Sequence, residues 1–347
     1  MLLDSPPEPR ADTVPAPPTH RAIRSLGLLV SVVILAFVAL ASIAIGAKGL
    51  SPAQVWHGLF HDSGTYADVV VGDRLSRTVL GLLAGAALGL AGAVLQALTR
   101  NPLADPGLLG INAGASAAVV TAITYFGVTS LSGYVWFAFL GAAAVGALVW
   151  FLGGSRGATP VRLALAGTAI SAALYGYLQA VMIMDDAALG KMRFWTVGSL
   201  ASATDATIRQ VLPFLLAGTV LALALARPLN AVAMGDDAAR ALGAHPRRTR
   251  ALSMAAATVL CGAATAACGP IVFVGLMVPH AVRSFTGPDL RWILPYATVL
   301  SPVLLLGADV VGRVVARPAE LQVGIVTALL GGPVFIFLVR RRRTARL

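Results

Sequence analysis

Residues 75–98, LSRTVLGLLAGAALGLAGAVLQAL, show most directly how this chain folds, because Arg77 is their single charged residue. At about 1.5 Å per residue they make a helix of about 36 Å, enough to cross a hydrocarbon layer of roughly 30 Å. Gly81, Gly85 and Gly89 recur every four residues and form a ridge of small residues on one helix face. This ridge predicts close packing against another helix backbone.

The composition of the whole chain agrees with this stretch. Of its 347 residues, 57% are hydrophobic and 12% are charged, whereas soluble domains carry roughly 25% charged residues. The long unbroken apolar runs exclude a soluble enzyme, and they lack the alternating ten-residue pattern of a β-barrel. The sequence therefore predicts an all-α polytopic membrane protein.

About ten transmembrane helices are expected. The apolar runs occupy residues 26–45, 75–98, 107–126, 134–153, 161–184, 208–226, 251–268, 275–285, 293–314 and 321–339, of which 275–285 is short. Residues 1–25 are rich in proline and predict a disordered cytoplasmic tail. The predicted transmembrane domain is 26–340, followed by a basic C-terminus, 341–347.

The basic residues predict the orientation. With ten spans and both termini in the cytoplasm, 18 of the 26 Lys and Arg residues lie on the cytoplasmic side, including the run 340–343. This asymmetry follows the positive-inside rule and predicts a multi-pass protein of the cytoplasmic (inner) membrane. Because the basic residues lie between apolar runs and form no single stripe, nucleic acid is not an expected partner.

Residues 227–250 form the longest internal hydrophilic segment. Pro228 is expected to end the preceding span, and residues 235–237 offer an N-terminal cap for a short helix over 238–242. Gly243 can end that helix. The segment predicts a short surface helix on the cytoplasmic side, with an ordinary loop as the alternative.

A second cytoplasmic segment, RNPLADPG at residues 100–107, is bracketed by Pro102 and Pro106. The prolines predict a rigid non-helical break between two spans. Such a break at the mouth of a helix bundle can line or close a path through it.

The spans carry little ionisable chemistry. Asp309 is their main acid, and Arg313, four residues later, is within reach for an ion pair. This pattern suits helices that shift against one another better than a proton relay.

No catalytic or metal site is predicted. The two lysines, Lys48 and Lys191, lie outside any phosphate-loop pattern, and the histidines are scattered. The closest pair, His57 and His61, falls in an expected loop. Cys261 and Cys268 lie seven residues apart in one apolar run and are interpreted as packing residues.

Several ordered motifs resemble the FecCD family, the iron-siderophore and vitamin B12 ABC importer permeases. They are RLSRT (74–78), QALTRNPLADPGLLG (96–110), GPIVFVGLMVPH (269–280), AD (308–309) and EL (320–321), within a likeness that covers about residues 26–343. Within the family, IGAK (45–48), GINAGAS (110–116), RFW (193–195) and FIFLVRR (335–341) look most like the ferric-enterobactin branch.

The resemblance implies a type II ABC importer permease fold and a permease subunit that catalyses no bond chemistry and binds no cofactor. Its expected partners are a second permease subunit, two ATPase subunits that use ATP and Mg, an extracytoplasmic binding protein, a ferric siderophore and membrane lipid. The second permease subunit is expected to be a related paralogue, with a homodimer as the alternative. ATP-driven alternating access would move the siderophore into the cytoplasm.

The resemblance also implies roles for named residues. Arg74, Arg77 and Arg313 match positions that accept carboxylates of the binding protein, with simple membrane-edge anchoring as the alternative. Arg317 has no counterpart. Residues expected to couple to the ATPase are Asp236, Asp237, Ala239, Arg240, Leu242 and Gly243.

A cytoplasmic gate is expected at Asn101 and Leu103, with Pro160 and Val161 as a second part. The stretch 159–161 lacks the small hydroxyl pair expected in the vitamin B12 branch, which favours a siderophore. Cobalamin, haem or another iron chelate remains an alternative cargo. A secondary transporter driven by an ion gradient would need acidic residues in the spans, and few beyond Asp309 are present.

Overall fold

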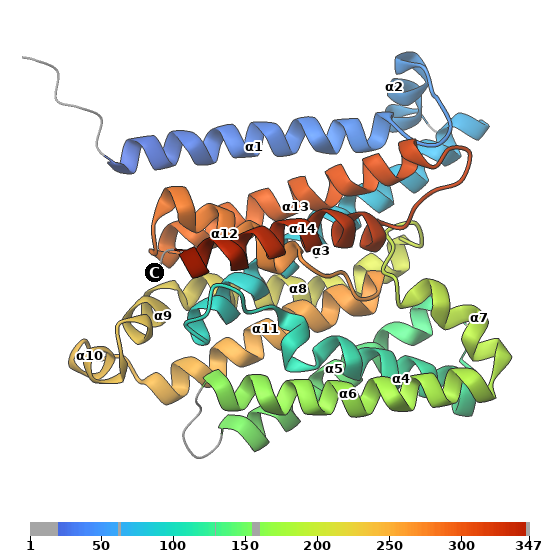
Figure 1. Ribbon diagram of the computed structural model, residues 1–347. Helices are drawn as coiled ribbons and strands as arrows, with labels where there is room; N and C mark the ends of the chain where they lie inside the picture. The colour runs from blue at the N-terminus through green and yellow to red at the C-terminus, as the bar shows by residue number, and fades with distance from the viewer. Residues whose placement is uncertain (1–19, 62–63, 129, 155–159, 345–347) are drawn as a thin grey trace, which may run out of the picture.

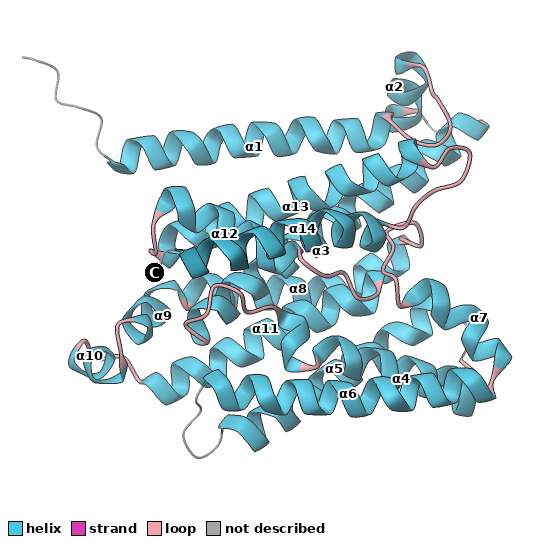
Figure 2. Ribbon diagram, in the orientation of Figure 1, coloured by secondary structure: helices cyan, strands magenta, loops and turns pink. Residues whose placement is uncertain are grey.

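The computed structural model of the protein describes residues 20–61, 64–128, 130–154 and 160–344 (Figure 1). In these residues all regular structure is helical (Figure 2). The α-helices are α1 His20–Ala44, α2 Pro52–Phe60, α3 Tyr66–Leu98, α4 Ile111–Phe126, α5 Leu131–Gly154, α6 Pro160–Met184, α7 Asp186–Trp195, α8 Asp205–Ala224, α9 Ala226–Ala233, α10 Asp236–Ala241, α11 Pro246–Cys268, α12 Val274–Thr286, α13 Leu290–Val315 and α14 Val323–Thr344. A 3-10 helix, η1, spans Pro106–Leu109.

Each of the ten predicted apolar runs coincides with a helix. Among the described residues, seven helices are long and apolar enough to cross a membrane: α1, α3, α5, α6, α8, α11 and α13. Ile111–Phe126 and Val323–Phe337 form shorter apolar helices, and α12 has 13 residues. The prediction of an all-α polytopic membrane protein is confirmed.

The element boundaries differ from the prediction most clearly at the starts of α1 and α4. Residues 20–25 belong to α1, so that part of the predicted disordered tail is wrong, because no proline follows Pro18 there to prevent a helix. Residues 1–19 and 345–347 lie outside the described part of the chain. Helix α4 begins at Ile111 rather than at 107, since η1 and the left-handed Gly110 precede it.

Three helices, α2, α7 and α9, were not predicted, since all are short and partly polar. Pro228, expected to end the preceding span, instead lies in the first turn of α9, where proline is tolerated, and α8 already ends at Ala224. Helix α2 is held by a capping box at Ser51, and α7 is capped by Asp185, whose carboxylate accepts two backbone N–H groups. His57 therefore lies on a helix rather than in the expected loop. Its ring stacks on His61 and its Nδ1 lies 3.3 Å from the Asp68 carboxylate.

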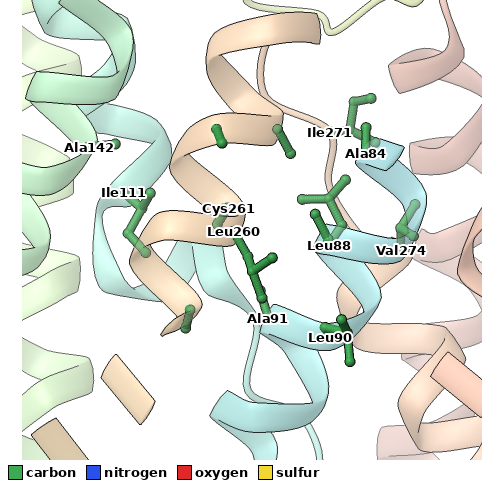
Figure 3. Packing of buried hydrophobic residues seen from close by; sticks show 14 of the residues in the cluster. Ala84, Leu88, Leu90, Ala91, Ile111, Ala142, Leu260, Cys261, Ile271 and Val274 are labelled. Carbon is green, nitrogen blue, oxygen red and sulfur yellow. The ribbon is translucent and has the colours of Figure 1, made fainter. Parts of the chain in front are cut away.

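The centre of the bundle is made by α3 and α11. In each of them 78% of the most apolar window is buried. Figure 3 shows Leu260 and Cys261 of α11 between α3 on one side and Ile111 of α4 on the other. Cys261 and Cys268 are both free and buried, in agreement with a packing role.

The glycine ridge of α3 lies against α13. A Cβ at Gly85 would come within 2.6 Å of the Pro302 Cα atom, and one at Gly89 would collide with Ser301. One turn further, a Cβ at Gly92 would overlap the backbone of Gly275 in α12. Glycine is therefore needed at these positions because two helix backbones occupy the space of a side chain.

The outermost elements are α1 and α6, which lie along opposite edges of the bundle (Figure 1). Only 17% of the apolar window of each is buried. The start of α1, the end of α14 and α10 lie at one end of the bundle, called here the α10 face. The opposite end, with α2 and α7, is called the α2 face (Figure 1).

The close approach of α3 and α13 gives a testable expectation for stability. Gly85→Ala should destabilise the protein by about 1–3 kcal/mol, because the new methyl group meets backbone that cannot move away. Gly72→Ala in the same helix is the control, since nothing lies within 4 Å of its Cβ position. That change should be neutral or stabilise by up to about 1 kcal/mol.

The measurement is the thermal midpoint of each purified variant in detergent, followed by the monodisperse fraction after heating. A Gly85→Ala variant as stable as the wild type would contradict the proposed backbone contact.

Candidate functional site

The α2 face contains a buried cluster of charges centred on Asp309 of α13. Arg77 of α3 donates to its carboxylate through Nε at 3.0 Å and Nη2 at 2.7 Å. The Nη2 atom of Arg313 lies 3.1 Å from the Oδ2 atom of the same carboxylate, so the predicted Asp309 and Arg313 ion pair is confirmed. The Nη1 atom of Arg77 also donates to Glu320 at 2.6 Å. One acid in the apolar bundle is thus fully neutralised by two cations.

The arginines of this cluster also hold the end of α1. Arg74 donates to the carbonyls of Ile43 and Ala44 at 3.2 and 3.0 Å. Arg313 donates to the carbonyl of Ser42 at 2.8 Å. The last turn of a helix has carbonyls without intrahelical partners and a partial negative charge, which cations satisfy. The cluster therefore joins α1, α3 and α13.

The chain beyond α1 is held in the same way. Arg74 also donates to the Lys48 carbonyl at 2.5 Å, and Arg317 donates to the Gly46 carbonyl at 2.7 Å. Arg317, for which sequence reasoning found no role, is therefore a clamp on this loop. No motif in the sequence predicts that an arginine side chain will donate to main-chain carbonyls in this way.

The structure differs here from the simplest docking picture. Arg74, Arg77 and Arg313, expected to face a partner, are 7%, 8% and 1% exposed. They are buried where the end of α1, Asp309 and Glu320 accept hydrogen bonds from most of their donors. Their docking role stays a prediction, and any such contact requires a partner to compete with these internal bonds.

A substitution at Asp309 tests the internal role of the cluster. Asp309→Asn should destabilise the protein by about 3–5 kcal/mol, because two buried arginines lose their counter-charge. Glu320→Gln should cost about 1 kcal/mol or less, since that carboxylate is partly exposed to solvent.

Thermal midpoints of the two purified variants in the same detergent provide the comparison. Equal midpoints would contradict the central position of Asp309.

The expected gate residues meet around a cavity at the α10 end. It has a volume of about 330 Å³ and lies between the loop after α3 and the first half of α6. Both Asn101 and Val161 line it. Leu103 is half-buried in the same loop, where its N–H is bonded by the Asn101 side chain at 3.0 Å. The side chain of Pro160 lies outside the described part of the chain.

Asp105 is an acidic member of this cavity that sequence reasoning missed. Its carboxylate caps η1 by accepting the Gly107 N–H at 2.8 Å. Burial raises the pKa of Asp105 to about 6, although the Gly107 bond opposes the shift. The pattern of Asp followed by Pro and Gly is a capping signal that could have predicted its position, but not its burial.

The predicted surface helix is present at the α10 face as α10. Gly235 precedes it at φ 120, and Gly243 ends it at φ 76. The Gly243 N–H bonds to Arg240 and the Ala244 N–H to Ala239, the closed end expected for glycine in this conformation. The prediction that Gly243 terminates this helix is confirmed.

The residues expected to couple to an ATPase divide into two groups. Asp237, Arg240, Leu242 and Gly243 are exposed on α10 and its end. Ala239, in contrast, is fully buried against Val232 of α9, since a helix this short needs an apolar anchor. Fewer than the six predicted residues are therefore exposed for contact with a partner.

Asp236 also differs from the expectation. Its carboxylate binds two arginines of this same chain, Arg250 at 2.6 Å and Arg100 at 3.2 Å. Partial burial raises the pKa of Asp236, but the Arg250 hydrogen bond and the surrounding positive charges outweigh this and lower it. Asp236 is thus ionised, and its carboxylate is already bound by these two arginines.

A surface cavity of about 470 Å³ lies beside α10. Leu242 and Met234 contribute exposed apolar side chains, and Arg227 and Arg291 contribute positive charge. Apolar and basic surface at one end of the bundle is suited to a protein partner. In the described residues, no group of three or more His, Cys, Asp or Glu side chains could hold a metal ion.

Comparisons with known proteins define the class of this bundle. A metal-chelate type ABC transporter, solved in an inward-facing conformation, aligns with a TM-score of 0.81 at 28% identity. That alignment covers 91% of this chain and 99% of that one. The chain is thus a membrane permease of the ABC importer type, a transport subunit and not an enzyme.

Residues 34–341 match the FecCD transport family, and the chain belongs to this family. It is 47% identical to the ferric enterobactin transport system permease protein FepD of Escherichia coli (strain K12), over 93% of this chain and 96% of FepD. It is 37% identical to the hemin transport system permease protein HmuU of Yersinia pestis, over 92% of this chain and 96% of HmuU.

Proposed function

We propose that the chain is one permease subunit of an ATP-driven importer that carries a ferric siderophore across the inner membrane into the cytoplasm. The observation that carries this proposal is the 47% identity to a ferric enterobactin permease over nearly the full length of both chains. Cobalamin, haem or another iron chelate is the alternative cargo, and the likeness to a hemin permease supports keeping haem among the candidates.

The path for the cargo is proposed to run along α6, between this chain and a second permease subunit. Val161, Leu165 and Ile183 of α6 are 65% exposed or more, although α6 borders the cavity of the expected gate. An apolar helix face beside a gate needs a protein or lipid neighbour. A related second subunit supplies one in this proposal, with a homodimer as the alternative.

The α10 face is proposed to be cytoplasmic and to receive the ATPase on Asp237, Arg240 and Leu242. Their exposure and the apolar and basic cavity beside them support this orientation. The start of α1 and the end of α14 are then both on the cytoplasmic side, because they lie at the same end of the bundle (Figure 1). ATP binding in the partner would move α10 and, through it, the gate.

An ion-gradient mechanism has less support. Asp309, the main acid of the spans, is closed off by Arg77 and Arg313. A carboxylate held by two arginines has no free site for a coupling ion or proton.

Uptake by the assembled complex tests the proposed function. The chain, its second permease subunit, its ATPase and its binding protein are placed in proteoliposomes with ATP inside. The lumen then stands for the cytoplasm, while the binding protein and cargo are outside. Iron-loaded catecholate, iron-loaded hydroxamate, cobalamin and haem are compared. Uptake of one iron chelate, and none with an ATPase lacking its phosphate-loop lysine, is the expected outcome.

Uptake of cobalamin or haem alone would change the cargo, and uptake driven by an ion gradient without ATP would overturn the mechanism. An empty-binding-protein control excludes passive leakage.

The α2 face is proposed to receive the binding protein. Arg74, Arg77, Arg313 and Arg317 outnumber Asp309 and Glu320, so this cluster carries an excess of positive charge. The buried arginines would act through this field as well as by exchanging their internal bonds.

Two surface substitutions test docking without breaking the Asp309 ion pairs. Glu320→Gln should strengthen binding of an acidic binding protein, and Arg317→Gln should weaken it, each by about two- to fivefold at low salt. Surface plasmon resonance on the reconstituted complex at two salt concentrations gives the affinities. Identical affinities for both variants would argue for membrane-edge anchoring instead.

A further inference from the structure

The chain leaves the end of α3 through a left-handed backbone conformation at a residue that is not glycine. Arg100 adopts a left-handed backbone conformation with φ 49. Its N–H bonds to the Ala97 carbonyl and that of Asn101 to the Gln96 carbonyl. Glycine is the usual residue here, because a side chain strains this conformation. A larger side chain in this place calls for a compensating interaction.

That interaction is with the segment around α10, 136 residues away in sequence. The guanidinium Nη2 atom of Arg100 donates to the Val232 carbonyl at the end of α9 and to the Asp236 carboxylate at the start of α10. The backbone of the same residue begins the gate loop, residues 100–107. One side chain therefore connects the gate loop directly to the surface helix.

Asp236 receives a second cation on the same oxygen atom. Arg250 of α11 donates to its Oδ1 atom at 2.6 Å and is the most buried of the three side chains. Arg250 fixes the carboxylate to the bundle, while Arg100 extends the connection to the gate loop. Val232 and Ala239 pack α9 against α10, so that these helices move as one body.

We propose that the Arg100 and Asp236 pair transmits movement of α10 to the gate loop, and that Asp236 is a positioning residue rather than an ATPase contact. This inference rests on the proposed function, in which α10 receives the ATPase. Without the pair, α10 still packs on α9 and α11, but its direct bond to residues 100–107 is lost. Movement of α10 caused by the ATPase would then move the gate loop less.

The first experiment needs no partner protein. Hydrogen exchange is measured on the full chain in lipid nanodiscs for the wild type, Arg100→Gln and Arg21→Gln. Arg21→Gln is the control, because it removes the same charge from an exposed side chain in the first turn of α1, at the same end of the bundle, and does not line the cavity beside α10. In Arg100→Gln, we expect faster exchange in both 101–107 and 236–242.

Faster exchange in 101–107 alone would mean that Arg100 only caps α3, and this outcome would overturn the proposal. No change in either segment would overturn it as well. The result holds whether or not the chain transports a siderophore, so failure of this inference is distinct from failure of the proposed function.

The second experiment measures cargo imported per ATP hydrolysed by the reconstituted complex. Arg100→Gln and Asp236→Asn should each lower this ratio by about fivefold, and the double variant should be no worse than either one. Arg100→Lys keeps the charge and should recover part of the ratio. Arg21→Gln should match the wild type.

A ratio that falls by about twenty-fivefold in the double variant would show that the two residues act independently, and a wild-type ratio in Arg100→Gln would show that the pair transmits nothing. A purely structural role would lower protein yield or thermal stability while leaving cargo per ATP unchanged in the molecules that assemble.

Discussion

The close approach of α3 to its neighbours is the constraint on which the rest of this structure depends. Gly85 and Gly92 let the backbones of α13 and α12 occupy space that side chains would fill. In a membrane no hydrophobic effect drives helices together, so contact of this kind supplies packing energy. Because α3 is held on several sides, its two ends are fixed relative to the whole bundle.

Both ends of α3 use arginine to connect separate elements. At the α2 face, Arg74 and Arg77 bind the end of α1 and Asp309. At the α10 face, Arg100 binds α9 and α10. The guanidinium group suits this work, since it has several donors in a fixed plane and keeps its charge when partly buried. A single rigid helix thus runs between the proposed binding-protein surface and the proposed gate.

Much of the fold could be predicted because it follows from local properties of the chain. Apolar runs had to become helices in a membrane, where backbone groups find partners only within the segment. Gly243 had to end α10 because few other residues adopt its conformation. The pairing of Asp309 with Arg313 followed from their spacing on one helix. The short helices α2, α7 and α9 escaped prediction because they are too brief and polar for a clear pattern.

The sequence by itself determined the class of protein, the spans and the family, since composition, helix length and ordered motifs are properties of neighbouring residues. Only the tertiary structure decided what the arginines and Asp236 bind. Arg77 meets Asp309 across 232 positions and Arg100 meets Asp236 across 136. Such partners are chosen by which helix ends packing brings together, and the small residues of α3 control that packing through contacts that no local pattern encodes.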